Sequence, residues 1–351
     1  WVCLITLVFL CLTVSVLISI IPVAYIINST KRSPTCNFSG VVHSSHFITS
    51  SRLALSFSLN RQLYGKAAYD IPAVKQRFGE LFVQLLIADC TALVAVRACT
   101  VMPEKMSFWS AIIKFLIPKM AEDIVEQSAL LIGARAYLRT TQWAMFQKFR
   151  RDVQVIGLFD GSSQVNLGII AGNLLPQTGM RGTNPSADKD KLDHLFNMKR
   201  ACSAFDAEQL RLFTHEEDDV LAGLLEVESE AINHLVLLVR DEITRLDQQL
   251  EQLKDEKLFD PRSLNAFRLA EQYCWIFAAS CCLQFWYYNQ DVLSEPLKDI
   301  TWLNLAIQLI CNKLRTNQPI DSALQETMAD YLNTYYQQNK MFSVIPTTIA
   351  E

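Results

Sequence analysis

One carboxylate stands on a glycine hinge between two apolar segments of the chain. The stretch RRDVQVIGLFDGSSQVNL covers residues 150–167, and its apolar run stops at Asp160 and Gly161 before an amphipathic run resumes. A carboxylate at a helix junction is suited to proton transfer, and a neighbouring glycine leaves room for a ligand. Ser162 or Ser163 is a good N-cap for a following helix, whose free N–H groups favour a nearby anion. Asp160 and Gly161 equally suit a simple capping turn, so both interpretations stay open.

Two further stretches place glycines at expected helix ends. NRQLYGK contains Arg61 and Gly65, and SALLIGARAYL contains Gly133. Gly133 is expected to end a helix, as glycine often does. Arg61 could bind an anionic ligand, or it could form a structural ion pair with Glu80 or Asp70.

The composition indicates a helical protein with a large core. The chain has 351 residues, of which 50% are hydrophobic and 19% charged, enough for one large core or two domains. With only 11 glycines and 11 prolines among long apolar-periodic runs, we expect an all-α fold. A net charge of −4 implies no broad basic surface, which argues against a nucleic-acid partner.

The cysteines and histidines indicate neither disulfides nor a metal site. Ten scattered cysteines form no CxxC pair, and most lie within apolar runs, so we expect free thiols in a reducing compartment. His43 and His46 have a spacing that could suggest a zinc site, but no cysteine or carboxylate cluster completes a ligand set.

Five helical runs precede residue 176. They are expected from about Ser51, from Pro72 to Val101, from Ser107 to Gly133 with a kink at Pro118, from Trp143 to before Asp160, and from Ser162 or Ser163 onward. Residues 51–175 are therefore expected to form a helical bundle of four or five long helices.

The N-terminal segment could cross a membrane. Residues 1–28 carry no charge, and Lys31 and Arg32 follow them, so residues 1–30 are long enough for one transmembrane helix with a cytosolic body beyond it. The alternative is a translated non-coding or misjoined segment, since the first residue is Trp1. We expect a cytoplasmic or membrane-associated protein, with residues 31–50 as a polar linker.

A second helical region is expected over residues 201–351, after a linker at 176–200 that is rich in proline, glycine and charge. Residues 273–289 are apolar nearly all round and indicate a core helix. An apolar heptad seam lies earlier in this region; it could pair with a partner chain, but we favour a hairpin within the chain. The seam consists of Ile232, Val236, Val239, Ile243, Leu246, Leu250 and Leu253.

NRQLYGK, SALLIGARAYL and RDVQVIGLFDG, in this order, resemble the C-terminal helical domain of the acyl-CoA dehydrogenase family. The family has an R-x-x-F-G corner, then a Q-x-x-G-G-x-G helix end, then an R-D helix leading to E-G-T. The resemblance covers about residues 45–175 and keeps the spacing from Arg151 to Asp160 without a gap. It implies an FAD flavoprotein of fatty acid metabolism that dehydrogenates the α,β bond of an acyl thioester, carried on CoA or on a carrier protein.

The resemblance also implies roles for single residues. Asp160 stands where the family has its glutamate base. Arg61 would meet the phosphate or adenine of FAD across a dimer interface, with Tyr64 alongside. Gly133 would lie at the flavin site, and Ser162 and Gln164 would approach FAD on the same chain. A homo-oligomer is therefore expected, and Arg151 and Asp152 are expected to form a structural pair.

The departures from the family pattern keep other functions open. Aspartate is one methylene shorter than glutamate, about 1.5 Å of reach, and proton transfer needs hydrogen-bond distance. Nitroalkane oxidases share this fold and use aspartate, so a flavin oxidase or monooxygenase is an alternative. Leu130, Ala134 and Ala136 replace the family's glutamine and two of its glycines. A non-catalytic helical module for membrane attachment or dimerisation is the alternative from another class.

The family's N-terminal and middle domains have no expected counterpart in this chain. Those domains hold the flavin ring and the acyl chain, and residues 1–50 are too few to supply them. We therefore expect that the chain alone neither retains FAD nor reduces a dye acceptor with acyl-CoA. Very-long-chain members of the family carry an extra C-terminal helical domain that contacts membranes, and residues 201–351 resemble it in position and helical content only.

Overall fold

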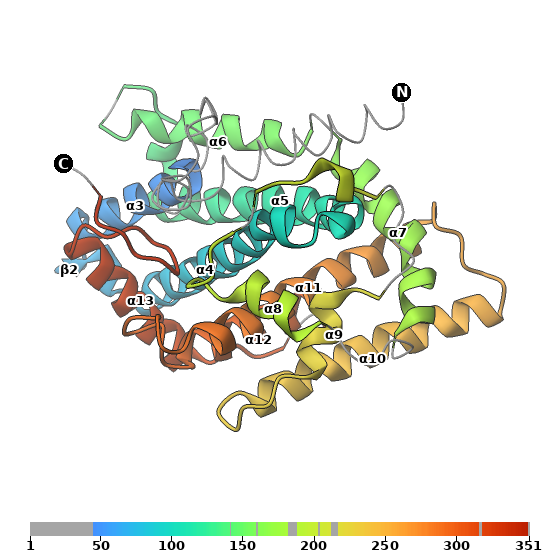
Figure 1. Ribbon diagram of the computed structural model, residues 1–351. Coiled ribbons are helices and arrows are strands. Elements are labelled where there is room, and N and C mark those ends of the chain that lie inside the picture. The colour runs from blue at the N-terminus through green and yellow to red at the C-terminus, as the bar shows by residue number, and fades with distance from the viewer. Residues whose placement is uncertain are drawn as a thin grey trace.

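Two long helices, α4 (Pro72–Val101) and α5 (Met106–Ile132), pack against each other in the middle of the molecule (Figure 1). The computed structural model describes residues 45–140, 142–158, 161–181, 188–202, 204–211, 217–315 and 318–349. The other α-helices are α3 (Ser45–Asn60), α6 (Ala144–Ile156), α7 (Ser163–Met180), α8 (Lys189–Phe196), α9 (Asp219–Leu225), α10 (Asn233–Asp255), α11 (Leu264–Asn289), α12 (Thr301–Leu314) and α13 (Ser322–Gln337). This architecture confirms the all-α prediction for the described ranges.

The remaining regular structure is short. Strands β1 (Gln62–Leu63) and β2 (Lys66–Ala67) form one antiparallel hairpin between α3 and α4. The 3₁₀ turns are η1 (Ala68–Asp70), η2 (Pro103–Lys105), η3 (Gly133–Tyr137) and η4 (Ala207–Gln209).

The central pair begins and ends as its sequence predicts. Pro72 is the first residue of α4, where its fixed φ suits a helix and its missing N–H costs nothing. Helix α5 runs through Pro118 and ends at Gly133, whose φ of 67° lies in the left-handed region that glycine adopts easily. Both helices are buried along most of their length, so they form the centre of the core.

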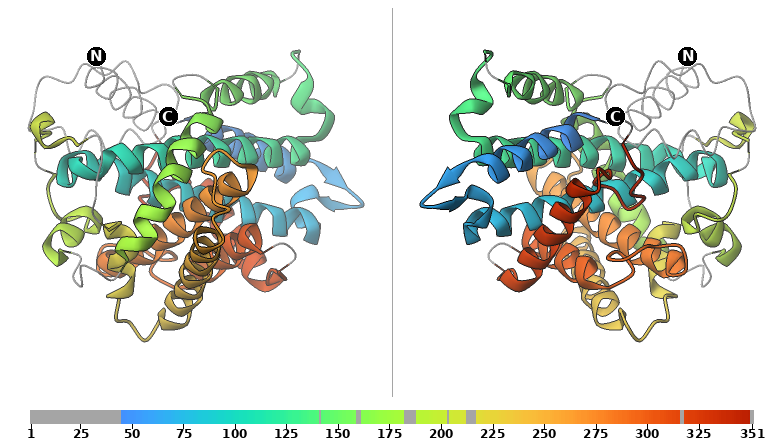
Figure 2. Two further views of the ribbon diagram at one scale, coloured as in Figure 1. Left: turned by 90° about the vertical axis from the view of Figure 1, so that its right-hand side faces the viewer. Right: turned by 90° about the vertical axis from the view of Figure 1, so that its left-hand side faces the viewer.

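The C-terminal helices cover one side of this pair. Figures 1 and 2 show α11, α12 and α13 on the side of the central helices opposite to α3 and α6. Helix α13 packs along α4. One hydrophobic core contains residues from both sides of the expected 176–200 boundary, so the two helical regions pack as one body.

The two predictions for the second region are confirmed. Residues 273–289 lie in α11, and all but two of the side chains from Tyr273 to Asn289 are buried. The heptad seam lies on α10 and contacts α11 and α7 of the same chain, which is the intrachain pairing. Six of the seven seam residues are buried, and Leu253 is partly buried.

Two expected linkers contain helix. Helix α3 already begins at Ser45, inside the expected linker 31–50, and α7 continues through Pro176 to Met180. Helix α8 lies wholly inside the expected linker 176–200. Asp188 explains its start, because the Asp188 carboxylate accepts hydrogen bonds from the N–H groups of Asp190 (3.1 Å) and Lys191 (3.2 Å). The division into domains stays a prediction, and residues 1–30 lie outside the described residues.

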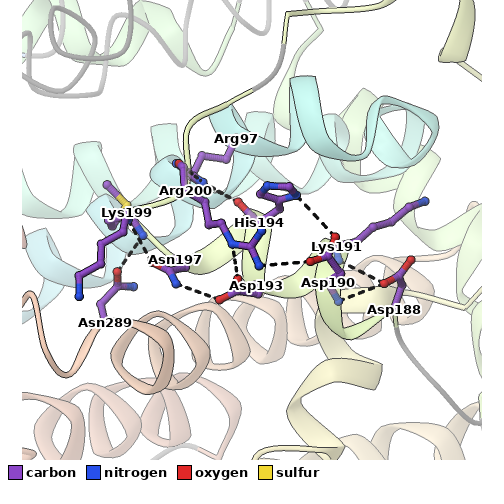
Figure 3. Close-up of polar contacts among 11 residues, drawn as sticks. Arg97, Asp188, Asp190, Lys191, Asp193, His194, Asn197, Lys199, Arg200 and Asn289 are labelled. Atoms are coloured by element: carbon purple, nitrogen blue, oxygen red, sulfur yellow. Dashed lines mark hydrogen bonds and ion pairs between the residues drawn. The ribbon is translucent and has the colours of Figure 1, made fainter.

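The C-terminal end of α8 is fixed by buried donors from two neighbouring helices (Figure 3). Arg97 of α4 is 2% exposed and donates to the carbonyl of Leu195 (2.9 Å) and to that of Arg200 (2.9 Å). Asn289 of α11 donates to the carbonyl of Phe196 (2.9 Å). Tertiary contacts thus satisfy the carbonyls that a helix end leaves without partners.

Helix α4 is the one described helix that is long and apolar enough to cross a membrane. In its most apolar window 89% is buried within the protein, so core packing accounts for its composition. The seven cysteines in the described ranges carry free thiols. No group of three or more His, Cys, Asp or Glu side chains there is placed to hold a metal ion.

Candidate functional site

The turn between α6 and α7 is the glycine hinge of the sequence. Asp160 lies outside the described residues, which resume at Gly161. Gly161 has a φ of 97°, a conformation that residues with a side chain rarely adopt. Ser162 is the N-cap residue of α7, as expected, with extended backbone angles, but its side chain makes no capping hydrogen bond. Ser162 is partly buried and Gln164 is exposed. The first N–H groups of a helix have no partner within the helix, so those of Gln164 and Val165 suit an anion.

Hydrogen bonds fix the start of α7 to the end of α6. The N–H of Ser163 donates to the carbonyl of Gly157 (3.2 Å), which closes the turn on itself. Asn166 is 2% exposed, and its amide donates to the carbonyls of Gly161 (2.9 Å) and Ser162 (3.0 Å). The outgoing side of the turn is therefore held by a buried side chain.

Two charged residues of α5 adjoin the same turn, and the sequence analysis missed both. The Lys114 ammonium donates to the carbonyl of Ile156 (2.8 Å), and Lys114 is 3% exposed. A Cβ on Gly157 would lie 3.0 Å from the Glu122 carboxylate, whose pKa is raised by burial. The signal for Lys114 was present, because it is a single charge within the apolar run SFWSAIIKFLIP.

The hairpin places Arg61 and Tyr64 on the surface. Tyr64 is 95% exposed at the tip with a φ of 51°, and Gly65 follows with a φ of 78°. Arg61 is exposed, and the ion pair considered with Glu80 or Asp70 does not form. The Glu80 carboxylate instead accepts a hydrogen bond from the Gln325 amide (2.5 Å). Both hairpin side chains can therefore contact a ligand or another subunit.

Gly133 and η3 lie at the same end of the molecule as the hairpin. A Cβ on Gly133 would meet no atom within 4 Å, so the backbone there is open to approach. The Arg135 guanidinium lies 5.4 Å from the ring centre of Phe57, in the last turn of α3, which gives this arginine a structural role. Tyr137 and Leu130 are 79% and 70% exposed.

The site residues fall into two groups at opposite ends of α5. Lys114 contacts the end of α6, which leads to Ser162 and Gln164, whereas Gly133 follows the last residue of α5. At 1.5 Å per residue, about 28 Å of helix separates Lys114 from Gly133. Figure 1 shows the hairpin at one end of the central helices and the start of α7 towards the other.

Three apolar side chains are exposed near the α6–α7 turn. Leu158, two residues after the end of α6, is 72% exposed. On α7, Val165 and Ile169 are exposed and four residues apart, so they share one helix face. Apolar side chains are therefore exposed both just before the turn and on the first two turns of α7.

One expected pair is wrong. Asp152 accepts a charge-assisted hydrogen bond from Lys148, one helical turn earlier on α6, rather than forming the expected structural pair with Arg151. Arg151 is exposed. The spacing explains the outcome, because residues four apart share a helix face and adjacent residues do not.

Comparison with known proteins confirms the expected resemblance. Residues 46–175 match the sequence model of the acyl-CoA dehydrogenase C-terminal domain. The fold is similar to the crystal structure of an acyl-CoA dehydrogenase complexed with FAD from Bacillus anthracis, with a TM-score of 0.59 and 12% sequence identity. No curated protein matches this chain.

The structural likeness extends beyond the family match. It covers 85% of this chain, far more than residues 46–175, so helices after α7 also take part in it. This chain covers 54% of the Bacillus anthracis chain, or about half of its length.

Proposed function

We propose that this chain provides the C-terminal helical part of an FAD-dependent dehydrogenase that acts on acyl thioesters, with Asp160 as its base. The observation that carries the proposal is the α6–α7 turn. It places a glycine with a φ of 97° and a helix N-terminus directly after Asp160, within the residues that match the family. The substrate would be carried on CoA or on a carrier protein.

The chemistry assigned to this chain is removal of the α proton. The Asp160 carboxylate takes the proton from the carbon next to the thioester carbonyl, which leaves the electron pair to form the α,β double bond. A bound FAD would supply the acceptor for the β hydrogen, which leaves as hydride. The N-terminus of α7 favours the ionised carboxylate that a base requires. Gly161 adds no side chain beside the shorter aspartate, which lets a substrate approach closely.

The described residues fit a flavin at two places. The first turn of α7, with Ser162 and Gln164, offers N–H groups and an exposed amide. The exposed guanidinium of Arg61 suits a pyrophosphate, with Tyr64 beside it and the open backbone of Gly133 at the same end. These places lie towards opposite ends of α5, with about 28 Å of helix between Lys114 and Gly133, so we propose that they meet flavins in different subunits of a homo-oligomer.

A flavin oxidase or monooxygenase of the same fold is the second candidate, and the aspartate favours it. The shorter side chain suits a small substrate that can approach the turn more closely than an acyl thioester. Residues 1–30 would attach either enzyme to a membrane, so the protein is proposed to be cytoplasmic or membrane-associated.

The experiment compares two purified proteins. One is the chain itself, and the other carries an N-terminal helical domain and a middle β domain of the family before residue 45. We expect the chain alone to be colourless, and the longer protein to be yellow and to bleach when acyl-CoA is added. A longer protein that folds but never binds FAD would contradict the proposal and favour a non-catalytic module.

A further inference from the structure

Lys114 is a buried cation in an apolar helix. Its side chain is 3% exposed, and its neighbours in sequence, Ile113 and Phe115, are buried as well. Burial of an ammonium group costs free energy unless the charge finds hydrogen-bond acceptors. An uncharged side chain would fill the same space without this cost. The contacts of the ammonium therefore indicate why a lysine stands here.

The described contact is with the end of α6. The Lys114 ammonium donates to the carbonyl of Ile156 (2.8 Å), and Ile156 is the last residue of α6. Carbonyls at a helix C-terminus lack partners within the helix and carry a partial negative charge. Lys114 thus fixes the point at which the chain leaves α6 and enters the turn.

A second buried side chain holds the other side of the turn. Asn166 donates to the carbonyls of Gly161 (2.9 Å) and Ser162 (3.0 Å) from one turn inside α7. The N–H of Ser163 joins the two sides by its hydrogen bond to Gly157. Both described ends of the turn are therefore bound by buried groups, Lys114 on α5 and Asn166 on α7.

We propose that Lys114 and Asn166 are positioning residues that hold the end of α6 and the start of α7, the two backbone segments that flank Asp160 in the sequence. This inference rests on the proposed function for the role of Asp160. An error of about 1 Å in the position of a reacting group can cost about a hundredfold in rate. An aspartate has less reach than a glutamate, so its backbone must be held more closely.

Hydrogen–deuterium exchange of the chain itself tests the positioning. In Lys114→Met we expect exchange across residues 157–163 to rise at least tenfold, with unchanged exchange in the middle of α5 and in α11. Lys114→Arg should keep wild-type exchange. The control is Lys66→Met, which removes an exposed lysine from the hairpin at the other end of the molecule and should change nothing in the turn.

The exchange data have two outcomes that would overturn the inference. One is unchanged exchange at residues 157–163 in Lys114→Met. The other is a uniform rise over the whole chain, which would show that Lys114 only contributes to global stability. For a variant that folds poorly, Lys114→Ala with added propylammonium provides a second measurement. Restored protection of the turn by the amine supports the inference, and an absence of rescue contradicts it.

Turnover by the longer, FAD-loaded protein provides a second test of whether Lys114 and Asn166 act as positioning residues. Lys114→Met and Asn166→Leu should each lower kcat about a hundredfold and leave KM within about twofold, because binding does not need the base. An equal loss in both constants, or none, would contradict positioning. A wild-type protein without turnover would refute the proposed function, whereas the exchange experiment would still decide the role of Lys114.

Discussion

Gly79 of α4 packs directly against the backbone of Gln325 on α13. A Cβ at Gly79 would lie 1.8 Å from the Gln325 carbonyl oxygen, a distance that no pair of non-bonded atoms tolerates. The glycine therefore sets how closely α13 can approach the centre of the fold. Because α13 is the last helix, this contact ties the end of the chain to α4.

Gly79→Ala should destabilise the protein by about 3 kcal/mol or more, because backbone rather than a flexible side chain must move. Urea denaturation followed by circular dichroism measures the loss. The control is Gly172→Ala on α7, where a Cβ meets nothing within 4 Å. There alanine should be neutral or stabilise the helix by up to about 1 kcal/mol. Equal effects of the two substitutions would contradict the close approach.

Asp89 of α4 predicts a dependence of stability on pH. Its carboxyl group is buried and accepts hydrogen bonds from the Ser343 hydroxyl (2.5 Å) and the Val344 N–H (2.9 Å). Burial raises the pKa of this carboxyl group from 3.8 to about 6. A raised pKa means that folding favours the protonated form. Its contribution is thus complete below about pH 4 and is lost as the pH rises through 6.

Asp89→Asn isolates this contribution, because the amide keeps an acceptor oxygen and has no charge. Two pKa units correspond to roughly 3 kcal/mol. The difference in unfolding free energy, variant minus wild type, should therefore increase by roughly 3 kcal/mol between pH 4 and pH 7. Urea midpoints at several pH values measure the difference. Parallel pH curves for the two proteins would show that Asp89 does not titrate in this range.

Arg97 should be essential for the docking of α8. Arg97→Met leaves buried carbonyls at the end of α8 without donors, for an expected loss of about 3–5 kcal/mol. Arg97→Lys should recover little, since one ammonium cannot replace a planar guanidinium that binds several carbonyls. Urea denaturation gives the loss, and early proteolysis within residues 188–202 would report release of α8. Arg200→Met, which removes an exposed arginine nearby, should cost under about 1 kcal/mol.

Arg61 should contribute to flavin binding in the longer protein. Arg61→Met should weaken FAD retention about tenfold or more, because a guanidinium bound to a phosphate makes charge-assisted hydrogen bonds. Equilibrium dialysis of FAD measures the change. Lys66→Met removes a charge from the same hairpin and should have a much smaller effect. Equal losses would indicate that only the net charge of the hairpin matters.

Long periodic patterns in the sequence allowed the helices to be predicted. Features that depend on contacts between residues far apart in the sequence could not be predicted. The α10 seam and the apolar residues of α11 are local patterns, so both helices and their burial followed from the sequence. Helix α8 was taken for a linker because its composition is polar. Its stability comes from Arg97 and Asn289, which are about 100 residues away in each direction.

The candidate site shows the same limit. Gly133 and Gly161 allowed a helix end and a turn to be predicted, and both have backbone conformations that favour glycine. Lys114 gave only a weak signal, because nothing in its own segment shows that its ammonium reaches Ile156 on another helix. The contact of Arg135 with Phe57 could likewise not be predicted, because it depends on the packing of α3 near η3.

The most direct test of the central claim is proton exchange at the α carbon of an acyl thioester. The longer, FAD-loaded protein is incubated in D₂O with an acyl-CoA that cannot be oxidised, and deuterium incorporation is followed by mass spectrometry. We predict that the wild type exchanges the α proton, and that Asp160→Asn abolishes exchange while FAD stays bound. Undiminished exchange in Asp160→Asn would show that Asp160 is not the base.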